Sequence, residues 1–128
     1  VAHSHDLFLH MDGARISNAA AALNVPIAEF TSAAGVDVLS FGGTKNGAIG
    51  AEAVVIMNPG RGVRLGHLAK QSMQLSSKMR YNAAQFTALF GSDLWLQNAQ
   101  HANAMAARLA AGIDGKLRIS FLFMGEAP

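Results

Sequence analysis

Two short apolar runs, within residues 6–11 and 36–41, each pass directly into polar and glycine residues. The first ends at Asp12-Gly13, and the second ends at the glycine-rich loop 42–47. Short apolar runs bounded by turn residues are typical of buried strands. The alanine-rich segment 15–24 between them predicts a helix. Strand, helix and strand at this spacing predict a βαβ unit with two parallel strands, which places the chain in the α/β class.

The rest of the chain continues the alternation of strands and helices. Pro26 suits the first turn of a helix, and Ser92 or Asp93 suits a new helix start. The further elements that we expect are a helix over 26–34, a strand over 52–57, a helix over 63–77, one or two helices over 81–112 with a break at 91–93, and a strand over 116–123. We therefore expect mostly parallel strands joined by crossover helices.

Composition narrows the class of protein. Hydrophobic residues make up 51% of the 128 residues and charged residues 14%, which excludes intrinsic disorder. So few charges indicate that another subunit or further chain covers part of the surface. The absence of cysteine excludes disulfide scaffolds and thiolate zinc sites, and fits a cytoplasmic protein. No apolar window is long enough for a membrane span, and the start at Val1, without a signal-like leader, suggests a fragment.

A basic cluster lies between residues 61 and 80. It comprises Arg61, Arg64, Lys70, Lys78 and Arg80, and this stretch has no acidic residue. Such a cluster can bind nucleic acid, but no aromatic residues alternate with these charges to stack on bases. A solvated helix face, or a site for a phosphate or carboxylate, explains the cluster without nucleic acid. We expect no nucleic-acid partner.

Asp12 and Lys45 are the residues with the clearest chemical potential. Ligands of open α/β sheets bind beyond the carboxyl ends of the strands, where both residues are expected. A lysine amine and a carboxylate in one cleft meet the needs of pyridoxal phosphate, because the amine condenses with its aldehyde and the carboxylate pairs with its pyridine nitrogen. An ordinary surface pair, or two unrelated loop residues, would show the same spacing. The glycine-rich segment 42–50 matches neither the Walker nor the dinucleotide pattern.

Two motifs together resemble the core of the L-threonine aldolases. They are His10-Met-Asp-Gly-Ala-Arg15 and Ser40-Phe-Gly-Gly-Thr-Lys-Asn-Gly47. The similarity continues through 70–80, is weaker near Trp95 and His101, and covers roughly residues 6–111. The L-threonine aldolases are pyridoxal-phosphate enzymes of the aspartate-aminotransferase fold type. The resemblance therefore implies part of the large domain of that fold, with pyridoxal 5'-phosphate as the cofactor.

The resemblance also implies roles for individual residues. Lys45 matches the Schiff-base lysine, and Asp12 matches the partner of the pyridine nitrogen. Arg15 matches the arginine that binds the substrate carboxylate, a task that suits a planar guanidinium. Arg80 matches an arginine near the cofactor phosphate and the subunit interface, which implies a homodimer or homotetramer. Thr44, beside the lysine, is expected to help position the cofactor.

The implied reaction cleaves L-threonine or L-allo-threonine to glycine and acetaldehyde. A β-eliminating lyase of the same fold would use the same Lys45 and Asp12, and a non-catalytic fragment or a basic binding module are further alternatives. Members of the family are much longer than this chain. We therefore expect residues 1–90 to form the second half of the cofactor-binding domain, and residues 91–128 to form its exit helix and the start of a small domain. On its own the chain is expected to retain residual cofactor binding at most.

Histidines suggest a competing metal site. His3 and His5 would share one face of a strand, and His10 precedes Asp12. No carboxylate set accompanies them, so we expect an exposed segment and no metal. His10 is expected to pack or to form a hydrogen bond at the edge of the sheet.

Overall fold

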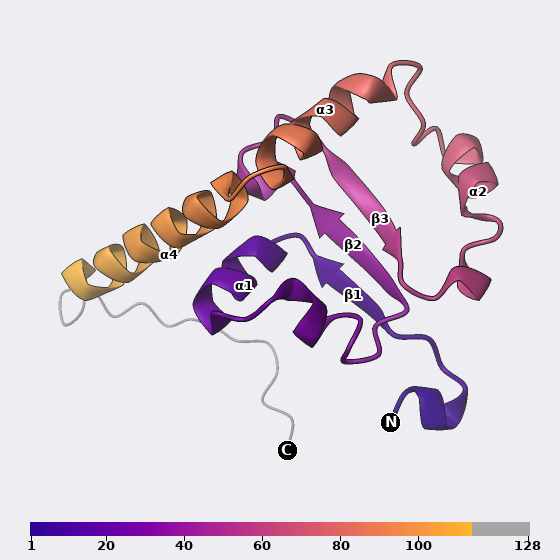
Figure 1. The fold of residues 1–128 in the computed structure, drawn as a ribbon, viewed down its shortest axis with the longest axis horizontal. Helices are drawn as coiled ribbons and strands as arrows, with labels where there is room; N and C mark the ends of the chain where they lie inside the picture. Colours follow the sequence, from indigo (N-terminus) through magenta and orange to yellow (C-terminus); the bar gives the residue numbers. More distant parts are fainter. Residues whose placement is uncertain (114–128) are drawn as a thin grey trace.

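The computed structural model of the protein describes residues 1–113 and contains a three-stranded sheet with helices packed against it (Figure 1). The strands are β1 (His10–Gly13), β2 (Val38–Gly42) and β3 (Glu52–Ile56), and they lie in the order β1-β2-β3. The α/β class predicted from the sequence is confirmed.

Only one of the two strand pairs is parallel. β1 and β2 run in parallel with Asp12 opposite Ser40, as the βαβ unit predicted. β2 and β3 are antiparallel, so the prediction of mostly parallel strands is wrong for β3. The connection 43–51 explains the difference, because a parallel crossover needs about a dozen residues or more. The result is a small mixed sheet.

The strand predicted over residues 6–11 begins later than expected, at His10. The Leu9 carbonyl accepts hydrogen bonds from the backbone of Asp37 and Val38, at 2.9 and 3.3 Å. The Leu9 N–H donates instead to the side-chain carboxylate of Asp37, at 2.9 Å. A side chain thus replaces the next rung of the backbone ladder, and the pairing of β1 ends there. Leu7 and Leu9 are exposed rather than buried.

The helices follow the predicted order with two corrections in length. The α-helices are α1 (Ile16–Leu23), α2 (Leu65–Gln71), α3 (Met79–Phe90) and α4 (Leu94–Ile113), and the short 3-10 helices are η1 (His3–His5), η2 (Ile27–Phe30), η3 (Thr44–Asn46) and η4 (Pro59–Arg61). The break predicted at 91–93 separates α3 from α4 and is confirmed.

The helix predicted over 26–34 is reduced to the single turn η2, and the one predicted over 63–77 is reduced to α2. At the end of η2, the hydroxyl of Thr31 donates to the Ile27 carbonyl at 2.7 Å. Serine and threonine hydroxyls that bond to nearby carbonyls compete with continued helix. The strand predicted over 116–123 lies outside the described residues.

The core lies between α1 and the sheet. Ile16, Val36 and Leu39 are its buried members, each at most 3% exposed. Phe41 joins this core to an aromatic cluster, because its ring lies 4.9 Å from that of Phe90, which in turn stacks on Trp95 at 5.9 Å. These contacts hold the end of α3 and the start of α4 against β2.

The opposite face of the sheet is open. His10 and Asp12 alternate with the core residues of β1, and Ser40 and Val54 lie beside them on the neighbouring strands. Val54 is 54% exposed. A hollow of about 560 Å³ lies over this face between the sheet and the helices α2 and α3. Within residues 1–113, no helix combines the length and apolar character needed to cross a bilayer.

Candidate functional site

Asp12 lies near the carboxyl end of β1, with its side chain on the open face of the sheet. One carboxylate oxygen, Oδ1, accepts a hydrogen bond from the backbone N–H of Ala14 at 2.9 Å. This local bond fixes the carboxylate where the chain turns from β1 toward α1. The second oxygen has no partner among the described residues and Asp12 is exposed, so a ligand can reach it.

Thr44 and Lys45 are the first two residues of the turn η3, which follows the carboxyl end of β2. The Thr44 N–H donates to the side chain of Glu52 at 3.3 Å, and the Asn46 N–H donates to the Gly43 carbonyl at 3.0 Å. Gly47 closes the turn with a φ of 114°, a conformation that favours glycine. The side chains of Thr44 and Lys45 are therefore presented outward from a fixed backbone.

Glycines let the two strand ends approach each other closely. A Cβ atom on Gly42 would lie 2.7 Å from the carbonyl oxygen of Ala14, and one on Gly13 would lie 2.7 Å from that of Ser40. Both distances are too short for any other residue type without a shift of the backbone. The sequence therefore brings the segment that carries Asp12 against the segment that carries Lys45.

The parallel pair places four of the five predicted site residues at one edge of the sheet. Asp12 and Arg15 follow β1, while Thr44 and Lys45 follow β2. They do not share one closed pocket: a hollow of about 330 Å³ beside Lys45 is lined by Asn18, Asn98 and His101 among others, and Asp12 is not part of its wall. The four residues surround an open edge.

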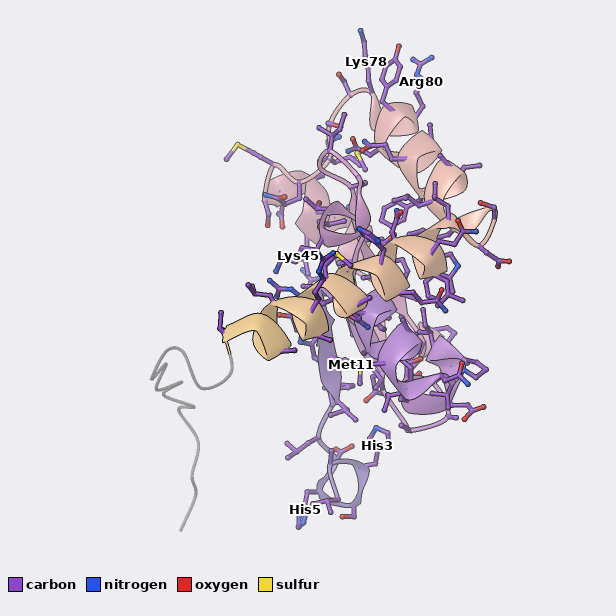
Figure 2. All side chains as sticks on the ribbon, turned by 90° about the vertical axis from the view of Figure 1, so that its left-hand side faces the viewer. His3, His5, Met11, Lys45, Lys78 and Arg80 are labelled. Atoms are coloured by element: carbon purple, nitrogen blue, oxygen red, sulfur yellow. The ribbon has the colours of Figure 1, made fainter. Side chains whose placement is uncertain are left out.

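Arg80 lies apart from the other predicted residues. It belongs to the first turn of α3, and Figure 2 shows it with Lys78 at the far tip of that helix, well away from Lys45. Lys78 and Arg80 are both exposed, and neither forms an ion pair within the described part of the chain. Within one chain, Arg80 does not join the edge that carries Lys45.

Asparagines on α4 were not identified from the sequence. The Asn46 side chain donates to the Trp95 carbonyl at 2.8 Å, and the Asn98 side chain donates to the Asn46 carbonyl at 2.9 Å. A second pair joins α1 to α4, since Asn18 and Asn103 exchange two hydrogen bonds of 3.0 Å each. Asparagine is unfavourable inside helices. Its repeated occurrence in the alanine-rich α4 was therefore the sequence feature that could have indicated side-chain contacts between this helix and the rest of the fold.

Asp37 was also missed, and it anchors the opposite edge of the sheet. Asp37 is 5% exposed, and its carboxylate accepts hydrogen bonds from the Leu9 N–H at 2.9 Å, from His3 at 2.9 Å and from Asn58 at 3.2 Å. The backbone hydrogen bond from Leu9 and then the contact with His3 lower the pKa of Asp37 to about 2. In the sequence, the feature that could have identified Asp37 was a charged residue between two valines in the strand predicted over 36–41.

His3 and His5 do not share one face of a strand, as a metal site formed by both would require. Residues 3–5 form η1, and Figure 2 shows His3 and His5 pointing in different directions, with His3 turned toward the fold. His10 instead contacts the hydroxyl of Ser40 at 2.8 Å, the hydrogen bond that was expected at the sheet edge. Among the described residues, no group of three metal-ligating side chains gathers in one place.

Parallel strands that bring a carboxylate and a lysine to their common carboxyl edge define an α/β protein, the class in which ligands bind outside that edge of the sheet. The chain belongs to the beta-eliminating lyase family, which matches it over residues 1–121. It is 46% identical over 121 residues to a low specificity L-threonine aldolase of Pseudomonas aeruginosa, and 43% identical to one of a Pseudomonas species.

Those alignments cover 94% of this chain but 35% of each relative, so the chain spans about a third of their length. A solved structure of the threonine aldolase of Leishmania major superimposes with a TM-score of 0.81 at 32% identity. That superposition covers 89% of this chain and 33% of the Leishmania chain. The resemblance to threonine aldolases that the two motifs indicated is confirmed.

Proposed function

We propose that this chain forms the part of a pyridoxal-phosphate-dependent aldolase that carries the cofactor lysine. The proposed reaction cleaves L-threonine or L-allo-threonine to glycine and acetaldehyde. The observation that carries the proposal is the parallel pairing of β1 and β2, which places Asp12 and Lys45 at one edge with Gly42 packed between their segments. The similarity to low specificity L-threonine aldolases supports the choice of substrate.

The donor set at this edge fits the cofactor. A carboxylate with one oxygen that has no partner within residues 1–113 suits a protonated ring nitrogen, and an exposed amine suits an aldehyde carbon. When bound, pyridoxal phosphate supplies an electron sink for the electron pair released as the Cα–Cβ bond of the substrate breaks. In this proposal Lys45 holds the cofactor, Thr44 helps to position it, and Asp12 keeps the proton on its ring nitrogen.

Arg15 and Arg80 have different places in the proposal. Arg15 follows Asp12 at the same edge, where its guanidinium can bind the substrate carboxylate through two hydrogen bonds. Arg80 lies at the exposed tip of α3, so a role near the cofactor phosphate requires that it act on the site of a neighbouring subunit. The proposal therefore includes a homodimer or homotetramer.

The test is an absorbance spectrum, with added pyridoxal phosphate, of a full-length protein that contains this sequence, for the wild type, Lys45→Ala and Lys70→Ala. A visible band that disappears only in Lys45→Ala supports the proposal, because Lys70 on α2 is also an exposed amine and lies away from the edge. A band that Lys70→Ala reduces as much as Lys45→Ala would show nonspecific reaction with surface amines, and would contradict the assignment of Lys45.

The family match favours one second candidate, a β-elimination reaction at the same residues. Such a lyase would release ammonia and a keto acid, whereas the aldolase releases glycine and an aldehyde. Product analysis with L-threonine, in a full-length protein that contains this sequence, distinguishes them. Formation of glycine supports the aldolase, and formation of a keto acid with ammonia supports the alternative.

A further inference from the structure

The residue after Lys45 is held by α4 from two sides. Asn46 is 5% exposed, and its side-chain amide donates to the Trp95 carbonyl at 2.8 Å. In return, the side-chain amide of Asn98 donates to the backbone carbonyl of Asn46 at 2.9 Å. We call these two hydrogen bonds the Asn46 clamp. They join the turn η3 to a helix about fifty residues further along the chain.

The Asn46 clamp adds to the local hydrogen bonds of the turn. η3 is a single 3-10 turn of three residues, in which the N–H groups of Asn46 and Ala48 donate to the Gly43 carbonyl at 3.0 and 3.1 Å, and the Gly47 N–H donates to the Thr44 carbonyl at 3.3 Å. Turns of this kind have poorer hydrogen-bond geometry than an α-helix, and both Thr44 and Lys45 are exposed. The Asn46 clamp fixes the main chain immediately after Lys45, and Figure 2 shows Lys45 lying alongside α4. The direction of the Lys45 side chain therefore depends on α4.

We infer that Asn98 is a positioning residue: through the carbonyl of Asn46 it fixes the direction from which the Lys45 amine meets the cofactor. The inference rests on the proposed function, since it concerns the reaction of Lys45 with pyridoxal phosphate. Removing the clamp leaves Lys45 and its amine in place but lets the turn sample other conformations. The fraction of chains with the amine correctly placed then falls.

The chain offers a matched control in its second asparagine pair. Asn103 donates to the Asn18 carbonyl at 3.0 Å and accepts from the Asn18 side chain at 3.0 Å. Like Asn98, it lies on α4, is partly buried and binds a backbone carbonyl of another element. It differs in holding α1 rather than the turn of Lys45. A merely structural role for Asn98 would make the two alanine variants behave alike.

The experiment measures which lysine pyridoxal phosphate modifies in a full-length protein that contains this sequence. The wild type, Asn98→Ala, Asn103→Ala and Lys45→Ala forms of that protein are incubated with pyridoxal phosphate, reduced with borohydride and digested. Mass spectrometry then gives the label on Lys45 relative to Lys70 and Lys78, which serve as internal references. Because one neutral hydrogen bond contributes a factor of roughly two to twelve, Asn98→Ala should lower this ratio by about that factor, and Asn103→Ala should leave it unchanged.

A second measurement covers the case in which Asn98→Ala unfolds. Asn98→Leu keeps the number and branching of the side-chain heavy atoms but has no donor, and it should lower the ratio in the same way. Amide hydrogen exchange of residues 43–48 should accelerate in Asn98→Ala or Asn98→Leu and not in Asn103→Ala, with or without cofactor. This readout reports the turn itself and does not depend on the chemistry of Lys45.

The outcomes separate the inference from the proposed function. A wild type that labels Lys45 no more than Lys70 and Lys78 would overturn the proposed role of Lys45, and this inference with it. A wild type that prefers Lys45, with equal preference and equal exchange in the Asn98 variants, would overturn the inference alone. Loss of preference in both Asn98→Ala and Asn103→Ala would also overturn it, because the effect would then be general destabilisation.

Discussion

Replacing Gly42 with alanine tests the close approach of the two strand ends. The added Cβ would lie 2.7 Å from the carbonyl oxygen of Ala14 and 2.8 Å from its Cα, well inside the 3.4 Å at which ordinary contacts begin. Both neighbours are backbone atoms, so no side chain can rotate away. Overpacking of this kind typically costs about 1–3 kcal/mol. Thermal unfolding followed by circular dichroism should show a melting temperature lower by about 4–12 °C.

Gly66→Ala is the matched control for this prediction. Gly66 lies within α2, and a Cβ there would meet nothing within 4 Å. The same added methyl group should stabilise the protein by about 0.5–1 kcal/mol, because alanine favours a helix. The two variants should therefore shift the melting temperature in opposite directions. A Gly42→Ala protein as stable as the wild type would refute the close approach of the segments that carry Asp12 and Lys45.

The remaining predictions concern Asp37 and the two faces of the sheet. The pKa of Asp37 is lowered to about 2 from an ordinary 3.8, so its ionised form stabilises the fold above about pH 4, and this contribution is lost as the pH falls toward 2. In acid titrations followed by fluorescence, Asp37→Asn should be less stable than the wild type at pH 7 and lose less stability between pH 4 and pH 2; parallel curves would contradict this. Leu39→Ala should cost about 2–5 kcal/mol in urea unfolding because Leu39 is 2% exposed, whereas Val54→Ala on the open face should cost less than about 1 kcal/mol; equal losses would show that the open face is covered.

Much of the fold could be predicted from local patterns. The two apolar runs that end in Asp12-Gly13 and in the loop 42–47 are sufficient for a parallel strand pair, because the alanine-rich segment between them can only cross over as a helix. The antiparallel direction of β3 was missed, although the connection 43–51 between β2 and β3 is too short for a parallel crossover. The late start of β1 was not predictable, since it depends on the side chain of Asp37, the residue that precedes β2.

The candidate site was predictable where chemistry follows from position on a strand. Asp12, Arg15, Thr44 and Lys45 lie at one edge because the ends of parallel strands meet there. The contacts of Asn46 with α4 could not be predicted, since they join residues 49 and 52 positions apart through side-chain amides. The position of Arg80 far from Lys45 could not be predicted from the sequence, because it depends on the direction in which α3 runs from the sheet.

The order of contacts along the chain has a consequence for how the molecule folds. The pairing of His10 with Val38 closes a short stretch of chain, whereas the contact of Asn98 with Asn46 closes a stretch of 52 residues. In the order of synthesis, Asp12 and Lys45 are both present about fifty residues before α4 begins at Leu94. A chain interrupted before α4 would therefore hold the carboxylate and the amine without the Asn98 contact to the turn that carries the lysine.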